Sequence, residues 1–149
     1  AHVTTTGSAR NQGWLRELGA SQVIDYTSAR FEDHVHDADV VIDLIGNVHD
    51  DTGTRSLSVL RPGGLLVNAP TGSWPTMRED ALEAGVRATG YKVSPSGATL
   101  AVLSRLFESG DLRVNLDHVL PLGEAAEAHR LLEEGHTRGK IVLEVSPEK

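Results

Sequence analysis

Residues 39–47 read DVVIDLIGN, and this stretch decides the fold class of the chain. From Val40 to Ile45 the residues form a nearly continuous apolar run that only Asp43 interrupts. A run of this kind is typical of a parallel strand that is covered on both faces. We therefore expect a buried parallel strand here, with Gly46 and Asn47 at its carboxyl end.

Helical and extended segments alternate on both sides of this strand. Amphipathic runs that stop at Gly19, Gly110 and Gly135 predict helices, because glycine readily takes the left-handed conformation that ends a helix. The other predicted strands are His2 to Thr6, Val23 to Tyr26, Leu65 to Ala69, Ala88 to Val93, Val114 to Leu120 and Lys140 to Val145. This alternation predicts an α/β fold with a mainly parallel sheet and flanking helices.

A further short helix is expected from Thr52 to Leu60, with Thr52 as its N-cap. The sequence RPGG at positions 61–64 then predicts a turn that ends this helix and leads into the strand from Leu65. This turn precedes a strand and does not open a helix, so it is not expected to bind phosphate. Its predicted role is structural.

The composition limits the classes of function. With 149 residues, 39% of them hydrophobic, the chain has the length of about one domain and enough apolar side chains for a core. Its net charge of -7 argues against a nucleic-acid partner, because binding of phosphates requires a basic surface. The absence of cysteine excludes disulfides, thiolate zinc sites and thiol nucleophiles. The apolar runs are far shorter than a membrane span, so no membrane partner is expected and a cytoplasmic location is predicted.

Four blocks of sequence, taken together, resemble the medium-chain dehydrogenase/reductase superfamily in its zinc-independent quinone-oxidoreductase branch. The blocks are RELGASQVIDYTSARFED (16–33), DVVIDLIGN (39–47), LSVLRPGGLLV (57–67) and AEAHRLLEEGHTRGKIVLEV (126–145). The last block is the most specific, because a helix bearing Ala128 and His129 leads through a glycine-bearing turn to a closing strand. In this order and spacing the blocks cover nearly all of the chain.

The resemblance implies a considerably longer protein, in which an N-terminal catalytic domain precedes a Rossmann domain. That catalytic domain, and the strand–GxGxxG–helix unit that opens a Rossmann domain, would both precede Ala1. The expected fold class is thus an incomplete Rossmann-like, doubly wound, mainly parallel sheet with flanking helices. Residues 1–110 would form the partial NADP-binding domain, and residues 111–149 would return to the catalytic domain. Alone, the chain is expected to be inactive.

The resemblance places the ribose-reading position at the end of the first predicted strand. An NAD site usually has an acidic residue there, whose carboxylate accepts a hydrogen bond from the ribose 2′-hydroxyl. This chain has Ser8 and Arg10 instead, and no acidic residue before Glu17. Because an arginine accommodates a 2′-phosphate that a carboxylate would repel, the expected cofactor is NADP(H). The alternative is that Arg10 is a solvated residue of the first helical turn.

Further residues of the cofactor site are expected where predicted strands end, because open α/β sheets bind ligands at the carboxyl ends of their strands. The resemblance places Tyr26 near the adenosine phosphate, and Gly46 would let the backbone approach the cofactor. The loops after the next two strands would lie near the nicotinamide and close over it. The predicted cofactor residues are Ser8, Arg10, Tyr26, Gly46, Asn47, Ala69, Pro70, Lys92 and Val93. A structural role is the alternative for each of them.

No catalytic or metal-binding residue can be assigned from the sequence. His34 and His36 lie among acidic residues, but two histidines in a loop do not make a zinc site, and we expect them to be solvated. His129 lies in the helical block of the resemblance and is expected to pack there.

The expected function is that of the cofactor-binding part of an NADPH-dependent oxidoreductase, whose complete protein transfers hydride to a small unsaturated carbonyl or quinone. One alternative is a methyltransferase that uses S-adenosylmethionine, since residues 39–67 also resemble that family's central strand and L-x-P-G-G turn. Ser8 and Arg10, and the C-terminal block, weigh against it. Another alternative is a nucleotide-binding or interaction module without turnover.

The absent first strand has a structural consequence. In the strand order 3-2-1-4-5-6, the first strand lies between the second and the fourth. Those two strands, predicted from His2 to Thr6 and from Val40 to Ile45, would each expose unpaired backbone N–H and C=O groups. They could pair directly with each other, take up a strand from elsewhere in the protein, or pair with a second chain. We expect the last outcome, a homo-oligomer joined through sheet edges.

Overall fold

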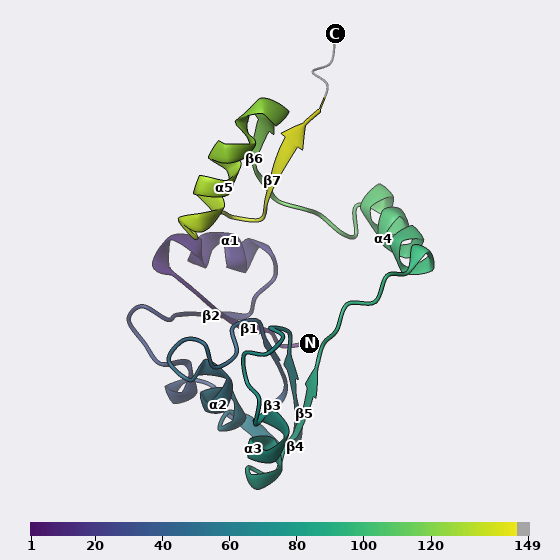
Figure 1. Ribbon diagram of the computed structural model, residues 1–149. Helices are drawn as coiled ribbons and strands as arrows, with labels where there is room; N and C mark the ends of the chain where they lie inside the picture. Colours follow the sequence, from purple (N-terminus) through teal and green to yellow (C-terminus); the bar gives the residue numbers. More distant parts are fainter. Residues whose placement is uncertain (146–149) are drawn as a thin grey trace. The chain divides into compact units, whose positions relative to one another are not determined.

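The computed structural model describes residues 1–145 (Figure 1). Its strands are β1 (Thr4–Gly7), β2 (Gln22–Asp25), β3 (Ala38–Asp43), β4 (Leu60–Asn68), β5 (Arg87–Gly90), β6 (Leu116–Pro121) and β7 (Lys140–Glu144). Its helices are α1 (Gln12–Glu17), α2 (Thr52–Leu57), α3 (Met77–Glu83), α4 (Gly97–Ser109) and α5 (Ala125–Glu133), with short 3₁₀ turns η1 (Ala9–Asn11), η2 (Phe31–Asp33) and η3 (Leu122–Glu124). The chain divides into two compact units, residues 1–93 and the residues from Ser94 onward, and each is described by itself.

The strand pairs found in residues 1–145 are all parallel. β1 pairs with β2, β4 lies between β3 and β5, and β6 pairs with β7. Parallel neighbours require crossover connections, and helices or 3₁₀ turns supply them here. The predicted α/β class, with mainly parallel strands and flanking helices, is confirmed.

The two strands that the resemblance places beside the absent first strand do not pair with each other. Within the described residues, β1 belongs to a sheet with β2, and β3 belongs to a separate sheet with β4 and β5. Direct pairing of the two strands is therefore not found in residues 1–145. β3 has one paired edge, toward β4, and one edge without a strand partner in residues 1–145.

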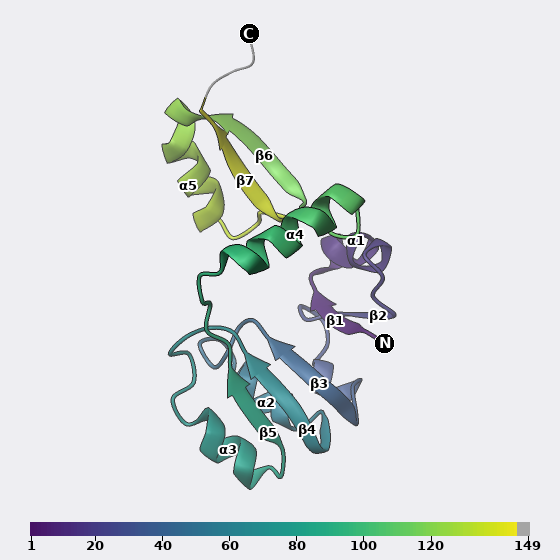
Figure 2. The same ribbon diagram turned by 90° about the vertical axis from the view of Figure 1, so that its right-hand side faces the viewer.

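The expectation that the strand from Val40 to Ile45 is covered on both faces is wrong for this chain. β3 ends at Asp43, and the side chains of Val40 and Ile42 are 52% and 70% exposed. The helices that pack on this sheet are α2 and α3, which also contact each other and therefore share one face (Figure 2). Since Val40 and Ile42 alternate with Val41 along the strand, they lie on the opposite, uncovered face.

The core of residues 1–93 lies between this sheet and its two helices. Leu66, in the middle of β4, is 0% exposed. The other buried core residues are Leu57, Leu60, Trp74, Met77, Ala81 and Val86. The core is thus mainly aliphatic, with one tryptophan, and every member comes from α2, β4, α3 or the segments that adjoin them.

Two local predictions around α2 are wrong. The N-cap position falls on Asp51, which has a φ of 45°, while the Thr52 hydroxyl donates to the carbonyl of His49 at 2.8 Å. The RPGG segment at 61–64 is not a turn before the strand but lies inside β4, which already begins at Leu60. The backbone absorbs this glycine-rich segment as an irregularity in the pairing with β3 between Ala38 and Val40.

The helix α3 lies in a segment for which the sequence predicted no element. Met77 and Ala81 are its two buried residues, one helical turn apart, and both contribute to the core. The Asp80 side chain accepts hydrogen bonds from the Trp74 indole at 2.7 Å and from the Thr76 hydroxyl at 2.9 Å. The chain just before the helix is therefore fixed to the helix itself.

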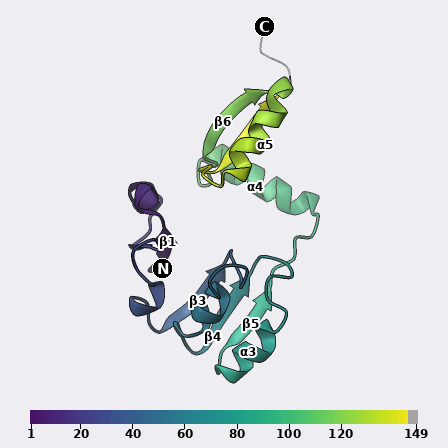
Figure 3. The same cartoon turned by 60° about the vertical axis from the view of Figure 1, so that its left-hand side comes forward.

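The unit from Ser94 onward contains the long helix α4 and the pair β6–β7, along which α5 lies (Figure 3). Ala128 of α5 is its only buried hydrophobic residue within the described part. Leu100, Leu103 and Phe107 of α4 are 64%, 37% and 44% exposed, and the helix has no buried residue. Gly110 follows α4 with a φ of 80°, as its predicted role as a helix end requires. No helix within residues 1–145 is long and apolar enough to cross a membrane.

Candidate functional site

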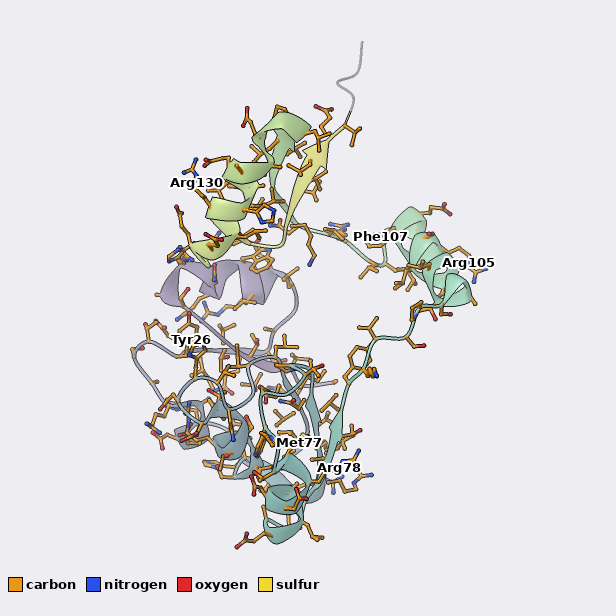
Figure 4. The ribbon with its side chains drawn as sticks, in the orientation of Figure 1. Tyr26, Met77, Arg78, Arg105, Phe107 and Arg130 are labelled. Carbon is orange, nitrogen blue, oxygen red and sulfur yellow. The ribbon has the colours of Figure 1, made fainter. Side chains whose placement is uncertain are left out.

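The parallel register of β1 and β2 brings one group of predicted cofactor residues to a single sheet edge. Gly7 pairs with Asp25, so Ser8 and Tyr26 follow the two strands at neighbouring positions. Tyr26 is 63% exposed and lies on the loop after β2 (Figure 4). Arg10 is exposed in the 3₁₀ turn that follows β1.

The hydroxyl of Ser8 is oriented by its neighbour. Ser8 is half-buried, and its Oγ accepts a hydrogen bond from Asn11 Nδ2 at 3.3 Å. A serine hydroxyl carries one proton in addition to its acceptor lone pairs, so this contact leaves the proton for another acceptor. Ser8 can therefore act as a hydrogen-bond donor at this edge.

Asp25 is a carboxylate at this edge that the sequence reading did not single out. It lies at the end of β2 and its Oδ1 accepts hydrogen bonds from the Thr27 N–H at 3.0 Å and the Thr27 hydroxyl at 2.7 Å. The signal that locates Asp25 is its position at the end of the neighbouring parallel strand, opposite Gly7.

Gly46 lies in the loop after β3, and all its polar backbone groups are used within the protein. Its N–H donates to Asp43 Oδ1 at 2.9 Å, and its carbonyl accepts from the Gly53 N–H at 3.1 Å. With a φ of 70°, a Cβ at this position would collide with the Ser73 side chain. The need for glycine here thus has a structural cause in the close approach of two loops. Its contact with the cofactor stays a prediction.

The side chain of Asn47 caps α2. Its Oδ1 accepts from the Thr54 N–H at 2.9 Å, and its Nδ2 donates to the Thr54 hydroxyl at 2.8 Å. Each of the two atoms keeps one further hydrogen-bonding site, because an amide nitrogen has two protons and an amide oxygen two lone pairs. The residue type thus has a structural explanation at the start of α2, and the contact of Asn47 with the cofactor stays a prediction.

The remaining predicted cofactor residues follow the next two strands. Ala69 and Pro70 come directly after β4 and are half-buried. β5 ends at Gly90, so Lys92 and Val93 lie beyond the strand and not at its last residues, and both are exposed. Because β3, β4 and β5 are parallel neighbours, all three loops lie at the carboxyl ends of the strands of one sheet.

A buried polar pair that the sequence reading missed joins these loops. Asp43 and Asn68 end β3 and β4, are paired in register, and are 4% and 7% exposed. Asn68 Nδ2 donates to Asp43 Oδ2 at 2.8 Å. In the sequence, Asp43 stands out only as an interruption of an apolar run.

The loop after β3 is also held from outside by an ion-pair cluster. Arg55 of α2 contacts Glu32 at 2.7 Å and Asp50 at 3.0 Å, and its guanidinium lies 4.9 Å from the Phe31 ring centre. Burial pulls the pKa of the Glu32 carboxyl upward, but hydrogen bonds from Arg55 and Arg30 and the charge of Arg55 outweigh it. The pKa of Glu32 therefore lies below its usual value.

An open apolar hollow of about 210 Å³ lies beside β1 and α1. It is lined by Val3, Thr5, Leu15, Leu18, Gly19 and Ala20. None of the nine predicted cofactor residues lines it, so it is not the candidate site.

Comparisons with known proteins agree with this architecture. The sequence profile of the zinc-binding dehydrogenase family matches residues 18–143. The mitochondrial NAD(P)H oxidoreductase RTN4IP1 of Danio rerio is 26% identical over 168 residues, which cover 97% of this chain and 43% of that protein. The chloroplastic NADPH-dependent alkenal/one oxidoreductase of Arabidopsis thaliana is 30% identical over 145 residues, covering 95% of this chain and 33% of that protein. Among solved structures, the quinone oxidoreductase from Coxiella burnetii superposes with a TM-score of 0.89 at 36% identity, over 97% of this chain and 45% of that chain.

The chain thus spans less than half the length of each of these relatives. The family profile covers most of the chain, from the end of α1 into β7, and so includes both described units. The matched structure shares its arrangement of strands and helices over nearly all of the chain. On this evidence the chain belongs to the zinc-binding dehydrogenase family.

Proposed function

We propose that this chain is the nucleotide-binding part of an NADPH-dependent oxidoreductase that reduces quinones or enones. The observation that carries the proposal is the family match over residues 18–143, combined with predicted cofactor residues that gather at the carboxyl ends of parallel strands. The relatives are named as NAD(P)H, alkenal/one and quinone oxidoreductases, which supports this reaction class. The substrate is a small molecule.

Ser8 and Arg10 are the proposed readers of the 2′-phosphate. Ser8 retains a hydroxyl proton for donation, and Arg10 supplies a guanidinium at the same strand end. Asp25 is the neighbouring carboxylate in the pairing scheme, and its Oδ1 accepts from Thr27. The support for NADP(H) over NAD(H) is that the chain after β1 supplies the Ser8 hydroxyl and the Arg10 guanidinium and no carboxylate before Glu17.

The loops after β3, β4 and β5 are the proposed contacts of the nicotinamide half. The nicotinamide, when bound, supplies the hydride. The protein's share is to hold Gly46, Asn47, Ala69, Pro70, Lys92 and Val93 at one sheet edge and to orient the cofactor through them. We assign no catalytic side chain, and we propose that residues 1–110 belong to the cofactor-binding domain and residues 111–149 to the return toward a catalytic domain.

The residues of this chain do not fit a zinc ion, despite the family's name. The sequence has no cysteine, and residues 1–145 contain no group of three or more His, Asp or Glu side chains close enough to hold a metal. His34 and His36 thus have no third ligand in the described part. No step of the proposed reaction uses a metal bound by this chain.

The methyltransferase reading is not favoured, because the matched relatives and the family profile are all oxidoreductases or dehydrogenases.

We also propose a homo-oligomer that is joined through unpaired edge strands. The edge of β3 that has no strand partner in residues 1–145 supports this proposal, and sedimentation of the purified chain tests it. A cytoplasmic location stays a proposal as well, and the two curated relatives above, which are named mitochondrial and chloroplastic, do not support it.

The test of the proposed function is Arg10→Glu in the complete protein. We expect the KM for NADPH to rise about tenfold or more, because a hydrogen bond to a charged group contributes about 1.5–3 kcal/mol, whereas the KM for NADH changes little. Arg16→Glu, an exposed change on α1, is the matched control and should leave both values unaltered. Equal losses for both cofactors would show that Arg10 does not read the phosphate.

A further inference from the structure

Asp43 and Asn68 have no assigned part in the proposed cofactor site, yet they lie at the base of its loops. Each is the last residue of its strand and more than nine-tenths buried. Buried polar side chains are almost always hydrogen-bonded, and leaving one unpaired is costly, so their partners indicate what they do.

The carboxylate of Asp43 is bound entirely by neutral donors. Its Oδ1 accepts from the backbone N–H groups of Ile45 and Gly46, both at 2.9 Å, and its Oδ2 accepts from Asn68 Nδ2 at 2.8 Å. No salt bridge to Asp43 is found in residues 1–145. These contacts turn the N–H groups of Ile45 and Gly46 toward the Asp43 carboxylate and so fix the direction of the backbone after β3.

The backbones of the same two residues continue the connection from loop to loop. The carbonyl of Asp43 accepts from the Ala69 N–H at 2.9 Å, and the carbonyl of Asn68 accepts from the Tyr91 N–H at 2.8 Å. Each of the three loops at this edge is therefore attached to the pair. These loops carry the predicted cofactor residues Gly46, Asn47, Ala69, Pro70, Lys92 and Val93.

Close packing above the pair adds a second constraint. Ser73 Oγ donates to the carbonyl of Pro70 at 2.8 Å, and it occupies the space that a side chain at position 46 would need. The loop after β4 thus lies against the loop after β3, with the polar pair beneath both.

We propose that Asp43 and Asn68 are positioning residues, which hold the three loops in the shape that binds the nicotinamide nucleotide without touching it. The inference rests on the proposed function, since it concerns the same site. It assigns the pair a role in cofactor affinity and not in the chemical step.

The polarity of the pair provides a sharp test. Asn68→Asp places two carboxylates together, whereas in Asp43→Asn alone the Asn68 amide can turn over and restore a hydrogen bond, so Asn68→Asp is the informative single variant. The double exchange Asp43→Asn/Asn68→Asp reverses donor and acceptor. It restores the hydrogen bond, leaves an oxygen at position 43 for the two N–H groups, and keeps the net charge.

The experiment measures NADPH affinity by titration calorimetry, and KM and kcat, in the complete protein. We expect Asn68→Asp to raise the Kd and KM for NADPH about tenfold, with kcat within about threefold of the parent value, and the double exchange to restore the Kd to within about threefold. Asp39→Asn, which removes an exposed carboxylate from β3, is the control for a change of charge on this sheet and should leave the Kd unchanged. Hydrogen exchange of the Gly46 amide should rise in Asn68→Asp and return in the double exchange.

Unchanged affinity in Asn68→Asp would overturn the proposal, as would a loss that the double exchange does not repair. If the single variant does not fold, the double exchange alone decides: an affinity more than about tenfold below the parent would overturn the proposal. A parent protein that binds no NADPH would instead refute the proposed function. Binding by the parent together with an unchanged Kd in Asn68→Asp would refute only the positioning role.

Discussion

The sheet of β3, β4 and β5 and the segment from Ser94 to Val145 differ in how they are stabilised. The sheet and its helices α2 and α3 enclose a core in which Leu66 is fully buried. From Ser94 to Val145, Ala128 is the only buried hydrophobic residue, although α4 carries an apolar stripe. Two helices that contact each other on one face of a sheet form a core together with that sheet. The segment from Ser94 to Val145 has regular helices and strands, but they bury few of its side chains.

The most severe way to probe this difference is a core truncation. We expect Leu66→Ala to lower the free energy of unfolding by about 3–5 kcal/mol, because it removes buried methyl groups and leaves a cavity. Leu100→Ala, at a 64% exposed position of α4, should cost less than about 1 kcal/mol. Urea denaturation of both variants measures the two losses. A loss at Leu100 as large as that at Leu66 would show that α4 is covered in the protein in solution, and would remove the contrast.

A second prediction sharpens the comparison by adding volume. A Cβ at Gly53 in α2 would lie 2.6 Å from Trp74 Cε3 and 2.8 Å from Asn47 Oδ1. We therefore expect Gly53→Ala to lower the free energy of unfolding by about 1–3 kcal/mol, despite the higher helix propensity of alanine. Gly13→Ala in α1, where a Cβ meets nothing within 4 Å, should instead be neutral or stabilising by about 0.5–1 kcal/mol. Thermal unfolding of the two variants compares them, and equal effects would contradict the close packing at Gly53.

The smallest expected effect is electrostatic. The folded pKa of Glu32 is lowered, so its ion pair with Arg55 stabilises the fold above the usual pKa of a glutamate, about 4.3, and this contribution is lost as the pH falls through the folded value. Glu32→Gln should thus cost about 0.2–1 kcal/mol at pH 7 and almost nothing in strong acid. Denaturation at both pH values tests this, with Glu108→Gln on α4 as a control that should be silent at both. A cost of Glu32→Gln that does not depend on pH would rule out the ion pair as its cause.

Much of the fold could be predicted from local pattern. β-branched and aliphatic runs located β2 and β7 to within two residues, and Gly110 located the end of α4. α3 was not predicted, because only Met77 and Ala81 face the core of this short helix, and two apolar positions are too few for a recognisable helical pattern. The RPGG segment has the composition of a turn, but pairing with β3 keeps it within β4, a tertiary effect that no local rule contains.

The site was harder to predict for a related reason. Gly46 and Asn47 attracted attention by their types and position, and the structure explains both residue types by loop packing and by the capping of α2. The role of Asp43 could not be predicted, because its partner Asn68 lies 25 residues away along the chain. A single sequence shows that a polar residue interrupts a strand, but only the parallel register shows that another polar residue lies beside it.

The polar pair also bears on how the sheet assembles. A slip of one residue between two parallel strands turns every side chain to the wrong face, so register is strongly specified where one face is buried. In β3 and β4 such a slip would put the buried carboxylate of Asp43 beside Val67 or Ala69, whose side chains have no proton to donate. Only the observed alignment gives the carboxylate a side-chain donor on the neighbouring strand, so the pair adds to the specificity of the register. The relative alignment of the loops after β3 and β4 follows from that register.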